Sequence, residues 1–80
     1  MAREQVTEIV AEMVANVLTL TVEPGERVAA GDTVVLLESM KMEIPLVATV
    51  NGHVSRILVE LGQIVQEGDP IVEIDETAGA

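Results

Sequence analysis

The chain has 80 residues, of which 14 are acidic and 4 are Lys or Arg, so its formal net charge is −10. This charge argues against nucleic-acid binding, because phosphates would be repelled, and the absence of Phe, Tyr and Trp removes base stacking. Cysteine is absent and His53 is the single histidine, which excludes a disulfide framework and a thiol-based metal site. No segment resembles a membrane span or a signal peptide, so we expect a cytoplasmic protein without a membrane partner.

The sequence predicts one all-β domain over residues 9–75, with a flexible segment at 1–8 and a flexible tail at 76–80. A first strand is expected within residues 7–13 and a second at 15–22. In the second, alternation places Leu18, Leu20 and Val22 on the buried face and Thr19 and Thr21 on the other.

Turn signals separate the remaining predicted strands. Glu23-Pro24-Gly25-Glu26 and Ala29-Ala30-Gly31-Asp32 predict turns around a short strand at 27–28. Strands at 33–39 and 42–47 follow. Pro45 lacks an amide hydrogen, so it should lie on a sheet edge or point away from a ladder. Three further strands are predicted at 54–59, 64–65 and 70–75. The turn signals before them are Asn51-Gly52, Gly62 and Gln66-Glu67-Gly68-Asp69, respectively.

The second half of the chain repeats the first at an offset of 37 residues, without a gap. The offset places Gly25 on Gly62, Gly31-Asp32 on Gly68-Asp69, and several valines on valines. Two copies of about four short strands predict a closed or flattened β-sandwich with quasi-twofold symmetry. Under this symmetry the hairpin that joins the halves lies at one end of the molecule and both termini lie at the other.

That hairpin contains Glu38-Ser39-Met40-Lys41-Met42-Glu43, with Met40 and Lys41 as the two residues at its tip. A lysine at a hairpin tip is often only a solvated surface residue, and the residues alone leave this interpretation open. A functional role for Lys41 is favoured because the tip lacks the Gly or Asn that a primed turn prefers, and because methionines flank the charged side chain.

Lysine is a poor nucleophile at neutral pH, and Glu38 and Glu43 favour its charged form. Lys41 therefore suits the role of an attachment point, acylated by a separate enzyme, better than that of a Schiff-base catalyst. His53, next to Gly52, is expected to be a solvated turn residue, and a metal site is not predicted.

The segment around Lys41 resembles the Glu-(Ala/Ser)-Met-Lys-Met signature of biotin carboxyl carrier domains. The likeness runs from about Ile9 to Ile74 and includes the turn motifs Glu23-Pro24-Gly25, Gly31-Asp32, Asn51-Gly52, Gly62 and Gly68-Asp69. It implies a barrel-sandwich hybrid, that is, a flattened barrel of two four-stranded antiparallel sheets. It also implies biotin in amide linkage to Lys41, with Met40 and Met42 flanking the site and Glu38 within the motif.

The resemblance further implies a small stand-alone carrier, not an enzyme in itself. Its implied partners are a biotin protein ligase, a biotin carboxylase and the carboxyltransferase of a biotin-dependent acyl-CoA carboxylase, and we expect a monomer. Two alternatives stay open. One is a lipoyl carrier for an acyl-transfer complex, although lipoyl domains usually place Asp before the lysine, where this chain has Met40. The other is a small β-sandwich interaction module whose lysine is unmodified.

Overall fold

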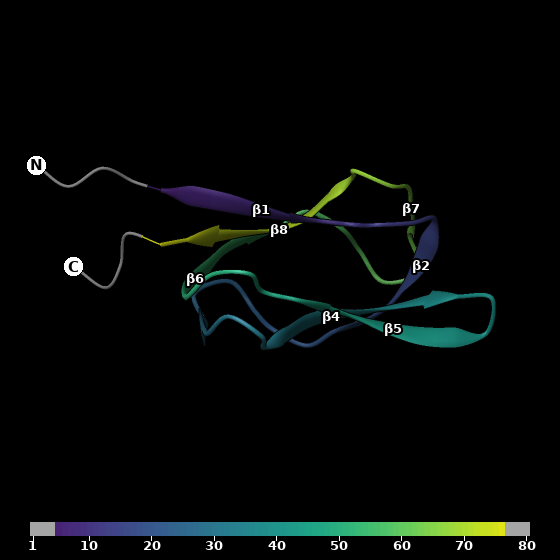
Figure 1. Ribbon diagram of the computed structural model, residues 1–80, viewed down its shortest axis with the longest axis horizontal. Helices are drawn as coiled ribbons and strands as arrows, with labels where there is room; N and C mark the ends of the chain where they lie inside the picture. Colours follow the sequence, from purple (N-terminus) through teal and green to yellow (C-terminus); the bar gives the residue numbers. More distant parts are fainter. Residues whose placement is uncertain (1–4, 77–80) are drawn as a thin grey trace, which may run out of the picture.

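Eight short β-strands joined by tight turns make up residues 5–76, the part of the chain that the computed structural model describes (Figure 1). In chain order the strands are β1 (Val6–Val10), β2 (Ala15–Leu20), β3 (Arg27–Val28), β4 (Thr33–Ser39), β5 (Met42–Val47), β6 (Gly52–Ile57), β7 (Ile64–Val65) and β8 (Pro70–Asp75). The strands form two four-stranded sheets, in the orders β1-β8-β6-β3 and β5-β4-β2-β7. Every pairing is antiparallel, so the predicted fold class is confirmed.

The internal repeat of the sequence is also a repeat of the structure. An offset of 37 residues carries β1 to β5, β2 to β6, β3 to β7 and β4 to β8, and so converts one sheet order into the other. The turns repeat as well: the Gly25 N–H donates to the Val54 carbonyl at 2.7 Å, and the Gly62 N–H donates to the Val17 carbonyl at 2.8 Å. Both glycines have positive φ, 92° and 83°, which a residue without Cβ adopts at little cost. The two halves therefore fold alike, and each half contributes two strands to each sheet.

The core lies between the two sheets and consists of aliphatic side chains. Within residues 5–76, every buried side chain is apolar, and the largest fully buried ones include Leu37, Ile71 and Ile74. Repeat-related valines such as Val17 and Val54 are both buried. Because burial of apolar surface is the main favourable term in folding, this two-layer core holds the hairpin rigidly at its base.

One strand departs from the predicted alternation. Leu18 was expected on the buried face with Leu20 and Val22, but its side chain is 38% exposed on the outer surface, while Val17 is buried. The β2–β4 register shifts between Val17 and Thr19. This bulge adds one residue to the strand and reverses the alternation, so the prediction for Leu18 is wrong.

The first strand, β1, begins and ends earlier than the predicted range 7–13, whereas β8 covers the predicted range 70–75. β1 begins at Val6, inside the segment 1–8 that was expected to be flexible, and Val6 already pairs with Asp75 of β8. The Thr7 hydroxyl donates to the Glu76 carboxylate, and the Glu76 N–H donates to the Gln5 carbonyl at 2.8 Å. These bonds satisfy backbone groups at the end of the sheet and anchor Glu76, which was assigned to the tail. The rest of both predicted terminal segments, residues 1–4 and 77–80, lies outside the described residues.

The β4–β5 hairpin lies at one end of the long axis, and β1 begins and β8 ends at the opposite end (Figure 1). β5 is an edge strand, so Pro45 sits where its missing N–H leaves no ladder bond unmade, as predicted. Within residues 5–76 the structure holds no helix of the length and apolarity that crossing a bilayer requires.

Candidate functional site

The tip of the β4–β5 hairpin is a two-residue turn formed by Met40 and Lys41. Ser39 pairs with Met42 across it, and Glu38 pairs with Glu43 one step further down. Both turn residues have positive φ, 53° for Met40 and 66° for Lys41, as a type I′ turn requires. The hairpin prediction is confirmed. The conformation is one that Gly or Asn adopts more readily, and it costs about 1–3 kcal/mol for each other residue.

The side chains at the tip point into solvent. Met40 is 91% exposed and Met42 is 65% exposed, and Lys41 between them is also exposed. The salt bridge found among residues 5–76 joins Arg56 to Glu73, in the other sheet. The Lys41 amine is therefore not held by an ion pair within the described part of the chain, and an incoming enzyme can reach it from the end of the molecule.

The base of the hairpin is firmly held. Leu37, 1% exposed, lies in the core and pairs with Ile44 of β5, which packs against the core from its edge. Beyond this pair the hairpin extends past the core and carries Glu38 in β4, Met40 in the turn and Met42 in β5. A rigid support thus presents a primary amine, and Lys41 is the only lysine in the sequence. The arrangement suits formation of an amide at Nζ by an external acyl donor.

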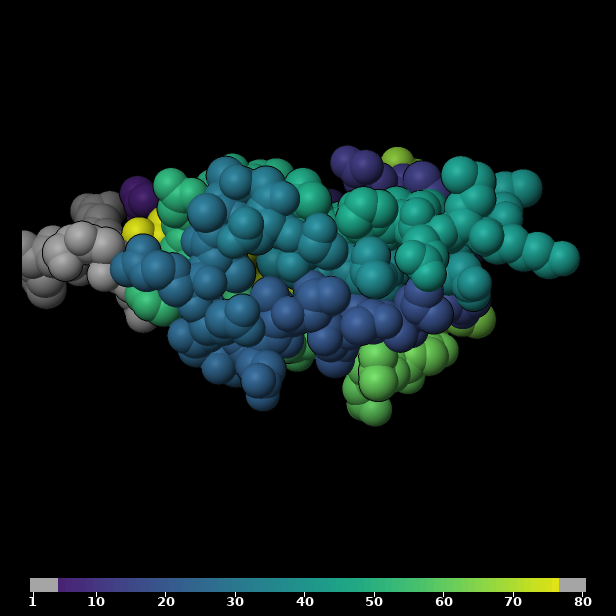
Figure 2. Space-filling view, turned by 90° about the horizontal axis from the view of Figure 1, so that it is seen from below, coloured from purple at the N-terminus to yellow at the C-terminus, as the bar shows by residue number. Residues whose placement is uncertain are grey.

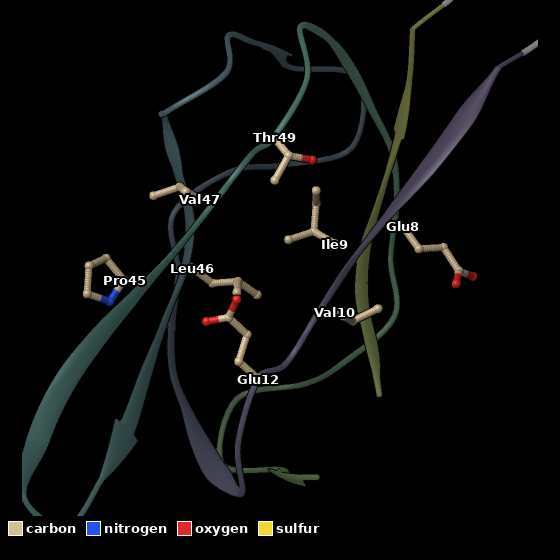
Figure 3. A pocket seen from close by; sticks show the side chains of 8 residues that line it. All are labelled: Glu8, Ile9, Val10, Glu12, Pro45, Leu46, Val47 and Thr49. Carbon is tan, nitrogen blue, oxygen red and sulfur yellow. The ribbon is translucent and has the colours of Figure 1, made fainter. Parts of the chain in front are cut away.

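A shallow hollow of about 210 Å³ lies between the edge strands β1 and β5 (Figure 3). The eight residues that line it form four pairs related by the repeat, so the hollow lies on the quasi-twofold axis; they are Glu8 with Pro45, Ile9 with Leu46, Val10 with Val47, and Glu12 with Thr49. Ile9 and Leu46 occupy its floor and are nearly buried. None of the residues at the lysine tip takes part, and we interpret the hollow as a consequence of the symmetric fold.

His53 lies at the other end of the molecule. It is half-buried in β6, where it pairs with Arg27 of β3 and Asp75 of β8. The prediction of a solvated turn residue is therefore wrong, because the strand begins at Gly52 and includes His53. Among the described residues, no group of three or more His, Cys, Asp or Glu side chains could hold a metal ion.

Comparisons with known proteins show which family this chain belongs to. The biotin/lipoyl family model, described as "Biotin-requiring enzyme", matches residues 5–74. The "Biotinylated protein TB7.3 homolog" of Mycobacterium leprae is 49% identical over 67 residues, which cover 84% of this chain and 94% of that protein. The "Biotin/lipoyl attachment protein" of Bacillus subtilis is 38% identical over 66 residues, covering 82% and 90%.

Among solved structures, the urea carboxylase of Kluyveromyces lactis contains a region that superposes with a TM-score of 0.84 at 30% sequence identity. The match covers 92% of this chain and 6% of the carboxylase. The chain thus corresponds to one small part of that protein.

Proposed function

Since the chain belongs to the biotin/lipoyl attachment family, we propose that it is a carrier protein whose residues 9–75 present Lys41 for covalent attachment of biotin. The observation that carries the proposal is the exposed Lys41 at a turn with two positive φ angles, on a hairpin anchored in the core. Nothing in the described structure crowds this amine, so the residues present fit an amide-linked group.

In the attachment step, the deprotonated Nζ of Lys41 attacks the acyl carbon of an activated biotinyl donor supplied by a biotin protein ligase. An N–C bond forms, the activating group leaves with its bonding electron pair, and Nζ gives up a proton. The amide has no charge, so the net charge of the protein falls from −10 to −11. Met40 and Met42 flank the reacting amine and are exposed, and Glu38 lies in β4 next to the tip.

We further propose that the loaded carrier works between a biotin carboxylase and the carboxyltransferase of a biotin-dependent acyl-CoA carboxylase. Biotin, when attached, supplies the atom that bears the carboxylate. The rigid hairpin fixes where the arm begins, and tethering raises the effective concentration of the carried group at both active sites. The likeness to a small part of a urea carboxylase supports this role; the two catalytic activities would come from other protein domains.

A lipoyl carrier is the second candidate, because the family model covers both groups and the B. subtilis relative is named for both. Met40, in the place where lipoyl domains usually have Asp, favours biotin.

Co-expression with a biotin ligase or with a lipoyl ligase, followed by intact-mass measurement, tests the assignment. We expect a single biotinyl increment in the wild-type chain and none in Lys41→Arg, which keeps the charge. Because the sequence has no other lysine, peptide mapping has to distinguish only Lys41 from the N-terminal amine. If the mass increases only by a lipoyl group, lipoate and not biotin is the group that the carrier bears. Folded protein that neither ligase modifies would refute both carrier functions and leave an unmodified interaction module.

A further inference from the structure

Four large apolar side chains are exposed beside the base of the lysine hairpin. We call them the apolar face: Val14 at 61%, Leu18 at 38%, Leu61 at 64% and Ile64 at 66% exposed. They come from β2, β7 and the turns next to them. Asn16 of β2 pairs with Ile64 on one side and with Glu38 of the hairpin on the other, so the apolar face is continuous with the hairpin within one sheet. Figure 2 shows the hairpin, in teal, projecting beside the blue surface of β2 and the green surface around β7.

The internal repeat provides a control for this surface. Offsetting the four positions by 37 residues gives exposed positions at the other end of the molecule, occupied by Asn51, Ser55, Pro24 and Arg27. The backbone is equivalent at both ends, so the fold forms without large aliphatic side chains at these positions. Aliphatic residues beside the lysine are therefore not explained by folding. Clustered exposed apolar residues mark interaction surfaces in soluble proteins.

The charges around the apolar face restrict its partner. Four residues on neighbouring strands are paired in sequence across the sheet: Glu43, Glu38, Asn16 and Ile64. Because directly opposed residues lie on the same face of a sheet, the two glutamates share a face with Ile64. The four strands of this sheet contain no Lys or Arg; Arg27 and Arg56 lie in the other sheet. A complementary partner thus has an apolar surface next to basic side chains.

We propose that the apolar face is the docking surface for the enzyme that acylates Lys41, which rests on the proposed carrier function. This enzyme must bring an acyl carbon within bonding distance of Nζ on the unmodified tip, so its surface comes close to the base of the hairpin. Enzymes that use the loaded group reach it through a longer arm and do not need the same contact. The partner is a biotin ligase with an apolar patch bordered by Lys or Arg.

The experiment exchanges residues between the two ends of the molecule. Val14→Asn with Ile64→Arg installs at the lysine end the residues found at the repeat-related positions, and Asn51→Val with Arg27→Ile is the reverse control. Biotinylation by purified ligase is followed by mass spectrometry at varied carrier concentration. We expect kcat/KM to fall at least about tenfold in the first variant, through KM, with kcat within about twofold of wild type and the control unchanged. Higher salt should lower kcat/KM of the wild type, because opposite charges steer the encounter.

Each outcome separates the two proposals. Equal kcat/KM in wild type and Val14→Asn/Ile64→Arg would overturn the docking surface and leave the carrier function intact, whereas an unmodified wild type would overturn both. Normal biotinylation with slower turnover by the carboxylase would overturn docking of the ligase and assign the face to that later partner. Far-UV circular dichroism checks folding. If the double variant does not fold, Leu61→Gln, in a turn, tests the same surface.

Discussion

Replacing Met40 by Gly should stabilise the protein. Met40 has a φ of 53°, and a non-glycine residue in this region costs about 1–3 kcal/mol. Glycine removes that cost but has more freedom in the unfolded chain, which offsets about 0.5–1 kcal/mol. The side chain is 91% exposed, so little burial is lost. The net gain is about 1 kcal/mol, which raises Tm by about 4–8 °C for a domain of this size.

Met42→Gly is the matched control. Met42 is also a methionine at the tip, but it lies in β5 with no positive φ, and a glycine within a strand destabilises by about 0.5–1 kcal/mol. The two variants should therefore shift the urea midpoint in opposite directions. Unfolding is followed by far-UV circular dichroism, because the sequence has no aromatic residue to fluoresce. A midpoint for Met40→Gly equal to or below that of wild type would refute the assignment of strain to the turn.

Three further predictions concern the scaffold. Gly52→Ala should lower the free energy of unfolding by about 1–3 kcal/mol, since the added Cβ would lie 2.3 Å from a carbonyl oxygen of β8. The control is the repeat-related Ala15→Gly, which should lower the free energy of unfolding by about 1 kcal/mol or less. Equal effects of the two substitutions would count against the close contact at Gly52. Leu37→Ala should cost about 2–5 kcal/mol in the same assay, because Leu37 is 1% exposed in the core beneath the hairpin, and a cost below about 1 kcal/mol would contradict this packing. Glu73→Gln tests the ion pair with Arg56, whose hydrogen bond and positive charge hold the pKa of Glu73 below its usual value. The pair stabilises the folded state at pH values above the usual pKa of a Glu carboxyl, and this stabilisation is lost as pH falls through the lowered pKa. The urea midpoints of wild type and variant should therefore differ at neutral pH and converge in acid.

Much of the site was predictable because its signals are local. The two apolar runs separated by Met40-Lys41 specify a hairpin, and the missing N–H of Pro45 specifies an edge strand. The gapless repeat specifies which strands are equivalent, and hence that the hairpin lies opposite the first and last strands. The predictions for Leu18 and His53 were wrong for one shared reason: strand ends and bulges depend on the neighbouring strand, which the local pattern does not record.

The sequence by itself determined the all-β class, the twofold repeat and a single lysine at the tip of a hairpin, because turn chemistry and periodicity act over a few residues. Tertiary structure alone decided that both tip residues have positive φ and that Leu18 turns outward. It also placed Val14, Leu61 and Ile64 beside the hairpin, although about 20 or more residues of chain separate each of them from Lys41. Such neighbours are set by pairing between distant strands, whose register is fixed when both sheets bury their apolar faces against each other. The sequence therefore predicted the amine at the hairpin tip, and the packing of the two sheets determined which residues surround the hairpin.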